Sequence, residues 1–141
     1  EILSLGNPDS MTRGVDAIHS VEDAAETGSL LAQELGTTLA ITGPVDLITD
    51  GVRTVRVENG DAMMPYVTGT GCSATAVIAA FAAVEKNMVS AAAGGLAFIG
   101  LAAEKAAEGS QGPGSFMIAL IDALYNLTPE DVKAGCRIVE A

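Results

Sequence analysis

The sequence contains no tryptophan, and its few phenylalanines and tyrosines make an aromatic share of only 4% in 141 residues. Small residues take their place, with 16 glycines and a hydrophobic share of 49%. This composition is typical of closely packed helices and argues against a disordered or collagen-like chain. The length is sufficient for one core, so we expect residues 1–141 to form a single domain.

Basic residues are also scarce. There are 7 lysines and arginines against 18 aspartates and glutamates, which gives a formal net charge of −11. Contacts with nucleic acid phosphates need lysine and arginine, so we expect no nucleic acid partner. An anionic substrate would have to be held by some other source of positive potential.

Cysteine occurs only at Cys72 and Cys136, far apart and in different surroundings, which predicts neither a disulfide framework nor a metal-binding spacing. A reducing, cytoplasmic compartment is therefore expected. The longest uncharged run, residues 87–103, is shorter than the roughly 20 apolar residues of a membrane span and favours a buried helix. No signal peptide is visible, and because the sequence starts at Glu1 within an apolar pattern, we interpret it as incomplete at the N-terminus.

Apolar periodicity predicts the elements of the first half. Residues 20–35 have helical spacing, with Ser20 and Asp23 in a capping-box-like arrangement and Gly36 at the end. Three strands follow, a buried one and then two short ones that form a hairpin, over residues 37–43, 46–50 and 53–58. We interpret Asp46, Asp50 and Glu58 as solvated strand ends.

The second half is predicted to be helical. Three helices are expected over residues 73–84, 88–108 and 115–125, the last after a "QGPG" stretch that interrupts any helix. A final helix begins at "TPEDV", with Thr128 as its cap and Pro129 at its first position.

The stretch "VTGTGCSATAVIAAF" (residues 67–81) places glycines and threonines directly before an apolar helical run. If Thr70 or Gly71 begins the helix, the first backbone amides have no partner within it, and with the helix dipole they form an anion site without a basic side chain. Gly69, Thr70 and Gly71 are therefore the candidate anion hole. A tight strand-to-helix connection would use the same glycines without a ligand, and that alternative stays open.

Cys72 lies at the start of this helix, where the dipole and amides favour a thiolate that acts as nucleophile or proton acceptor. A free cysteine is also a common core residue. The pattern "GTGCSA" fits G-x-G-x-x-A, but a helix rather than a βαβ unit follows, and no lysine follows the glycines as in a Walker A loop.

Together with "AITG" and "DLITDG" upstream and "EGSQGPGSF" downstream, this stretch resembles the later part of the hydroxyethylthiazole kinase family, in the ribokinase-like superfamily. The resemblance covers essentially the whole chain in order. It implies an α/β fold with a central, mostly parallel sheet flanked by helices, of which residues 1–141 are the C-terminal part and the N-terminal part is missing. It also implies a homotrimer with active sites between subunits.

The activity that the resemblance implies is transfer of the ATP γ-phosphoryl group to the alcohol of 4-methyl-5-(2-hydroxyethyl)thiazole, with Mg²⁺, in thiamine salvage. Thr42 matches the nucleotide-contacting threonine, and Gly69 matches the glycine that contacts the thiazole alcohol. Gly71 and Cys72 complete the anion hole, with Cys72 as the catalytic base. Glu1 matches the acidic residue that positions Mg²⁺.

Two departures from the family pattern are present. Tyr66 replaces a basic residue before the loop, and Ala74-Thr75 replace the usual Leu-Ser. Since the thiazole-lining residues of the N-terminal half are absent, a chain of this length is not expected to be active alone.

Three other functions stay open. One is a related kinase for a hydroxymethylpyrimidine alcohol. Another is a hydrolase with Cys72 as nucleophile and His19, the single histidine, as base. The third is a binding or oligomerisation module formed by the small-residue helices of residues 74–107.

Overall fold

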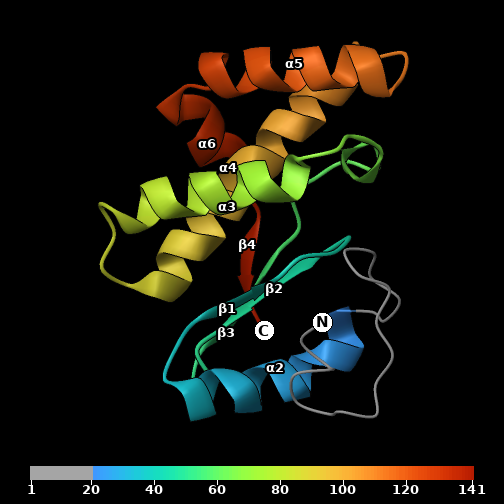
Figure 1. Cartoon of the computed structure of the whole chain (residues 1–141). Helices are drawn as coiled ribbons and strands as arrows, with labels where there is room; N and C mark the ends of the chain where they lie inside the picture. The colour runs from blue at the N-terminus through green and yellow to red at the C-terminus, as the bar shows by residue number, and fades with distance from the viewer. Residues whose placement is uncertain (1–20) are drawn as a thin grey trace.

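The structure is a computed structural model and describes residues 21–141. Figure 1 shows a small sheet with one helix on one face and a layer of helices on the other. In chain order the elements are α2 (Val21–Leu35), β1 (Leu39–Ile41), β2 (Asp46–Thr49), β3 (Thr54–Val57), the 3-10 helix η1 (Met64–Tyr66), α3 (Thr70–Ala82), α4 (Met88–Ala107), α5 (Pro113–Asn126), α6 (Pro129–Gly135) and β4 (Ile138–Glu140).

The sheet has the order β1-β2-β3-β4, and each neighbouring pair is antiparallel. The expectation of a mostly parallel sheet is therefore wrong for the described residues. The connections between β1 and β2 and between β2 and β3 have only four residues each, 42–45 and 50–53. A parallel crossover needs about a dozen or more residues, so these strands can only fold back on one another.

The predicted hairpin through Asp50-Gly51 is confirmed. The Asp50 amide donates to the Arg53 carbonyl at 3.2 Å, and Asp50 Oδ1 accepts from the amides of Val52 and Arg53. Gly51 has φ +86°, and a Cβ there would lie 2.7 Å from the Cβ of Gln33 on α2. Both the turn and the contact with α2 therefore require glycine at this position.

The prediction of a buried first strand is wrong. Ala40 is exposed and Leu39 and Ile41 are only half-buried, whereas all four residues of β2 are buried. β1 is at the edge of the described sheet and pairs with β2 alone. Apolar content indicates that a segment belongs in a sheet, but it does not indicate its position in that sheet.

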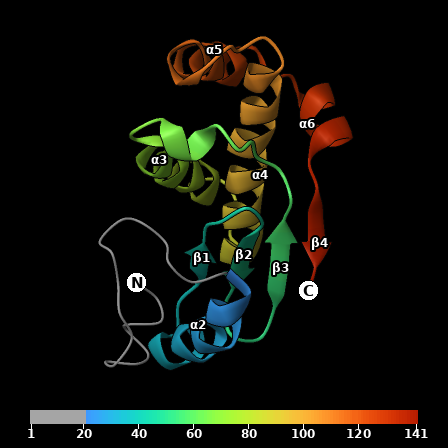
Figure 2. The same cartoon turned by 90° about the vertical axis from the view of Figure 1, so that its right-hand side faces the viewer.

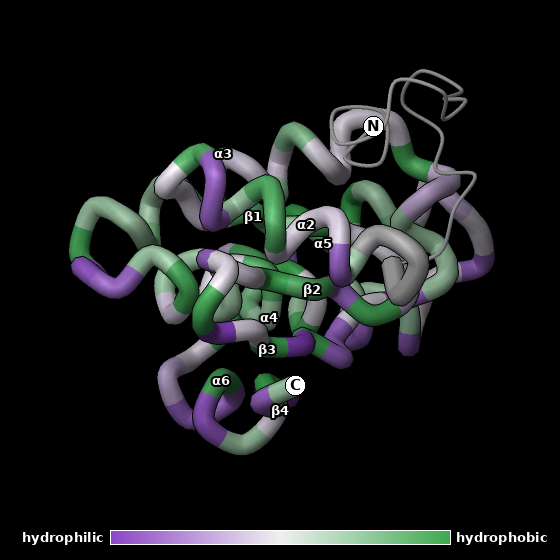
Figure 3. Tube along the Cα trace, turned by 90° about the horizontal axis from the view of Figure 1, so that it is seen from below, coloured by the Kyte–Doolittle hydropathy of each residue, from purple (hydrophilic) through white to green (hydrophobic). Residues whose placement is uncertain are grey.

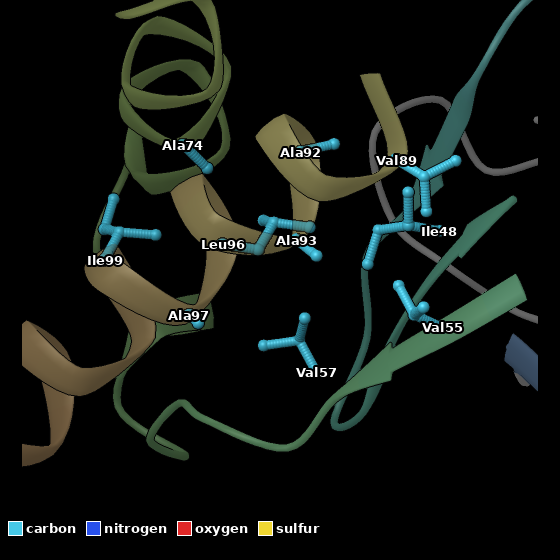
Figure 4. Packing of buried hydrophobic residues seen from close by; sticks show 10 residues of the cluster. All are labelled: Ile48, Val55, Val57, Ala74, Val89, Ala92, Ala93, Leu96, Ala97 and Ile99. Atoms are coloured by element: carbon cyan, nitrogen blue, oxygen red, sulfur yellow. The ribbon is translucent and has the colours of Figure 1, made fainter. Parts of the chain in front are cut away.

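Helix α4 is the centre of the core. Ile48, Val55 and Val57 of the sheet pack in one cluster with residues of α4 that include Val89 and Leu96 (Figure 4). By length and composition α4 could cross a membrane, yet 67% of its apolar window is buried inside the protein. The predicted buried helix is thus confirmed, and Figure 3 shows the apolar stretches of α4 and β2 next to each other.

A second cluster joins α4 to α5 and to the loop before α3. Phe116 and Leu120 of α5 are buried against Ala102 and Ala106 of α4, and Val67 of the loop belongs to the same cluster. Figure 2 shows α5 across one end of α4, and α3 beside α4 and crossing it. The loop that leads to α3 is therefore anchored in the core at Val67.

A buried polar network fixes the exit from β3. Asn59, only 5% exposed, donates from Nδ2 to Glu104 Oε1 at 3.1 Å and to the Gly135 carbonyl at 3.0 Å. Its Oδ1 accepts from the Arg137 amide at 2.6 Å, and Glu104 also accepts from the Gly60 amide and the Arg137 guanidinium. Burial raises the pKa of Glu104, but these hydrogen bonds outweigh it and leave that pKa below its ordinary value.

The predicted helix ends lie within three residues of those in the structure. The helix predicted over residues 20–35 is α2, which ends before Gly36 at φ +60°. α3 begins at Thr70, three residues earlier than predicted over 73–84. Thr128 caps α6 in a capping box with Asp131, as the "TPEDV" pattern predicted. β4, which was not predicted from the sequence, pairs with β3 in antiparallel orientation.

Glycine at position 95 lets α3 approach α4 closely, and its replacement should weaken this contact. A Cβ at Gly95 would lie 2.9 Å from the Cα of Ile78, a backbone atom, so Gly95→Ala is expected to lower the free energy of unfolding by about 1–3 kcal/mol. Gly94→Ala is the matched control. Its Cβ would meet only ring atoms of Phe81, which can move, so its effect should be much smaller. Denaturant unfolding of both variants measures the difference, and equal effects would contradict it.

Candidate anion site at the start of α3

Gly69 is the N-cap of α3. It has φ +95° and ψ −2°, a left-handed conformation that favours glycine. Its carbonyl accepts the first hydrogen bond of the helix, from the Ser73 amide at 2.9 Å. The turn into α3 therefore depends on a glycine at position 69.

Three backbone amides lie ahead of that first bond, those of Thr70, Gly71 and Cys72. No side chain caps α3, and within residues 21–141 no hydrogen bond from these three amides is found. Unpaired amides at a helix N-terminus, together with the helix dipole, attract anions. Thr70 and Gly71 of the candidate anion hole supply two of these amides and Cys72 supplies the third, whereas Gly69 is the N-cap.

No described residue fills the space in front of Gly69 and Gly71. A Cβ built on Gly69 or on Gly71 meets no atom within 4 Å. The backbone conformation explains glycine at position 69, but Gly71 has neither a positive φ nor a close neighbour among the described residues. The tight-connection alternative therefore accounts for Gly69 and not for Gly71, whereas close approach of a ligand accounts for both.

The hydroxyl of Thr70 is used within the loop. It donates toward the carbonyls of Met64 at 3.1 Å and Val67 at 3.2 Å. Only its backbone amide is therefore free to face an anion, and its side chain instead holds the loop in shape.

Cys72 is exposed and forms no disulfide, while Cys136 is half-buried beside the core. Ala74, two residues after Cys72, is buried in the first cluster. The helix thus directs residue 74 into the core and leaves the thiol of residue 72 at the surface of the described chain, beside the three amides that lack a partner there. This placement excludes the interpretation of Cys72 as a core residue of the described chain.

Thr42, the candidate nucleotide contact, is exposed on the β1–β2 connection. In Figure 1 this connection and the start of α3 lie on the same side of the molecule. The next amide along, that of Gly43, donates to Asp46 Oδ1 at 2.9 Å.

Asp46 is buried and 8% exposed, so its interpretation as a solvated strand end is wrong. Burial raises its pKa to about 6, although the hydrogen bond from Gly43 opposes this shift. The sequence does not reveal this burial, because an aspartate shortly after a Gly-Pro pair is also typical of an exposed turn. Asp50 and Glu58 do lie at strand ends, half-buried and exposed respectively.

Two predicted site residues, Glu1 and His19, lie outside the described residues. Among residues 21–141 no group of three histidine, cysteine, aspartate or glutamate side chains is placed to hold a metal ion.

The chain is similar to known proteins of one family. The Hydroxyethylthiazole kinase family profile matches residues 1–130. The chain is 63% identical over 141 residues to a hydroxyethylthiazole kinase of Desulfotalea psychrophila, covering 100% of this chain and 52% of that protein. A hydroxyethylthiazole kinase of Moorella thermoacetica is 49% identical over 138 residues, with 98% and 52% covered.

A solved structure is similar as well. The hydroxyethylthiazole kinase protein from Pyrococcus horikoshii OT3 superposes with a TM-score of 0.77 at 39% identity, over 85% of this chain and 47% of that one. The chain belongs to the hydroxyethylthiazole kinase family. It spans about half the length of the curated relatives that it matches.

The buried carboxylate of Asp46 should make stability depend on pH. Its folded-state pKa of about 6 lies above the ordinary value of 3.8, so ionisation costs folding free energy as pH rises through this window. Asp46→Asn keeps an acceptor for the Gly43 amide and carries no charge. We expect its Tm to match wild type near pH 4 and to exceed it near pH 7, in thermal unfolding of both proteins. A Tm difference that is the same at both pH values would contradict this assignment.

Replacing Gly71 with alanine tests whether a ligand approaches this glycine, because the change should affect ligand affinity and not stability. Gly71→Ala adds a methyl group in open space, so the Tm should stay equal or rise slightly, because alanine favours a helix by up to about 1 kcal/mol. We expect the affinity of the complete gene product for Mg²⁺·ATP, measured calorimetrically, to fall at least tenfold. Gly109→Ala, equally open but beyond the end of α4, is the control and should leave affinity unchanged. Unchanged affinity in Gly71→Ala would argue against an anion at this helix start.

Proposed function

We propose that the chain is part of a kinase that transfers the γ-phosphoryl group of ATP to the hydroxyl of 4-methyl-5-(2-hydroxyethyl)thiazole. Family membership supports this activity, and the observation that carries it is the set of amides of Thr70, Gly71 and Cys72, which have no partner within residues 21–141 and lie beside an exposed thiol. Residues 1–141 are proposed to be the C-terminal part of one ribokinase-like domain.

Phosphoryl transfer needs mainly positioning and charge stabilisation, since the transferred group spreads negative charge over its oxygens. Backbone amides that are fixed before the reaction stabilise such charge without reorganisation. Val67 in the core and the Thr70 hydroxyl bonds hold the loop that carries these amides. In this way an acidic chain can bind the terminal phosphate without a basic side chain at Tyr66.

Cys72 is proposed to accept the proton of the alcohol, or to orient its hydroxyl in line with the γ-phosphate. The thiol is exposed at the first turn of α3, next to the amides that would bind the phosphate. A general base placed in this manner contributes about 10²–10⁴ in rate.

The remaining assignments come from the family resemblance. Thr42 is proposed to contact ATP, Gly69 the thiazole alcohol, and Glu1 the Mg²⁺ that accompanies ATP as co-substrate. A homotrimer in the cytoplasm is the proposed state of the complete protein.

Substitution of Cys72 tests the proposal. In the complete gene product with Mg²⁺·ATP and the thiazole alcohol, we expect Cys72→Ala to lose at least a hundredfold in kcat, because no group then accepts the proton. Cys72→Asp should keep or improve turnover, since a carboxylate is also a base. The measurement is steady-state phosphorylation of the alcohol.

Cys136→Ala is the control, because Cys136 is the half-buried cysteine that follows α6, and its turnover should match wild type. Full activity in Cys72→Ala would remove the base assignment. Covalent labelling of Cys72 by an ester substrate, without ATP-dependent phosphorylation, would favour the hydrolase instead.

A further inference from the structure

We propose that Asp46 is a positioning residue for ATP: its buried carboxylate holds the β1–β2 connection in the shape that presents Thr42 to the nucleotide. This inference rests on the proposed function, since it takes Thr42 as the ATP contact.

The geometry at the connection supports this role. The ladder between β1 and β2 ends at the pair Ile41 and Leu47, so residues 42–45 form a link beyond the paired strands. Thr42 and Gly43 are exposed there, and Pro44 has no amide hydrogen to donate. The Gly43 amide bonds to Asp46 Oδ1 at 2.9 Å, which ties the residue next to Thr42 back to β2.

The anchor itself is buried in the sheet. Asp46 begins β2, is 8% exposed and pairs with Val57 of β3, which is 0% exposed. A side chain packed in a sheet interior keeps one rotamer, and a site supported by such a side chain is placed more accurately than one on a free loop. The bond from Gly43 therefore transfers the rigidity of the sheet to the neighbour of Thr42.

An aspartate at the buried position 46 needs an explanation. A buried carboxylate costs folding free energy when ionised, and an apolar residue of similar size would remove that cost. At the opposite end of β2, Asp50 also accepts backbone hydrogen bonds, from Val52 and Arg53, but there the group is more exposed. Of these two carboxylates, the buried one is therefore Asp46, which binds the amide of the residue after Thr42.

Two variants isolate the hydrogen bond from the charge. Asp46→Asn and Asp46→Leu both remove the buried charge and have similar size, but only asparagine keeps an acceptor for the Gly43 amide. Leucine suits a buried site, so both proteins should fold. The readouts are the calorimetric Kd for Mg²⁺·ATP and the KM values for ATP and for the thiazole alcohol, measured on the complete gene product.

We expect Asp46→Leu to raise the Kd and KM for ATP about tenfold and to change the alcohol KM less than twofold. Asp46→Asn should stay within twofold of wild type in all three. Asp50→Ala is the matched control at the other end of β2, and it should lower the Tm while leaving the ATP constants unchanged.

Equal ATP constants in Asp46→Leu and Asp46→Asn would overturn the positioning role. A parallel rise in the alcohol KM would also overturn it, because it would indicate a general structural defect. Wild-type protein that binds Mg²⁺·ATP but does not phosphorylate the thiazole alcohol would contradict the proposed substrate. In that case the Kd values of Asp46→Leu and Asp46→Asn for Mg²⁺·ATP would still test the role of Asp46.

Discussion

The close packing of α3 against α4 is the contact on which the candidate site depends. Gly95 lets the backbone of Ile78 approach α4, and Ala74 at the start of α3 is buried in the same cluster. Because the helix axis is held by these small residues, its N-terminus has one position relative to the sheet. The amides of the first turn, and the thiol of Cys72, are placed by that contact.

Around this contact, two anchors define the segment that enters α3. The Asn59 and Glu104 network holds the chain where it leaves β3, and Val67 holds it again in the second cluster. At the first residue of α3, the Thr70 hydroxyl donates back to the carbonyls of Met64 and Val67 in the loop. Such support is what a site made of backbone groups needs, since amides cannot be reoriented by a side-chain rotation.

Local signals in the sequence predicted much of this fold. The Asp50-Gly51 hairpin, the Thr128 cap and the buried helix α4 each follow from neighbouring residues, and each is confirmed. The expectation of a mostly parallel sheet is wrong for the described residues, because it came from the family resemblance and not from local patterns, which predicted the antiparallel hairpin correctly. The edge position of β1 and the return of β4 depend on pairing between distant segments, which no local pattern reports.

By itself the sequence determined that a helix follows the Gly-Thr-Gly-Cys loop and that no basic side chain lies in this loop, because both are local properties of the chain. The predicted helix began at residue 73, three residues after the start of α3 at Thr70. Only the tertiary structure decided that Cys72 is exposed while Ala74 is buried, that the Thr70 hydroxyl is consumed by the loop, and that Asp46 is inside the protein. Burial and hydrogen-bond partners are set by segments far apart in the chain, which meet only when α4 and the sheet pack together.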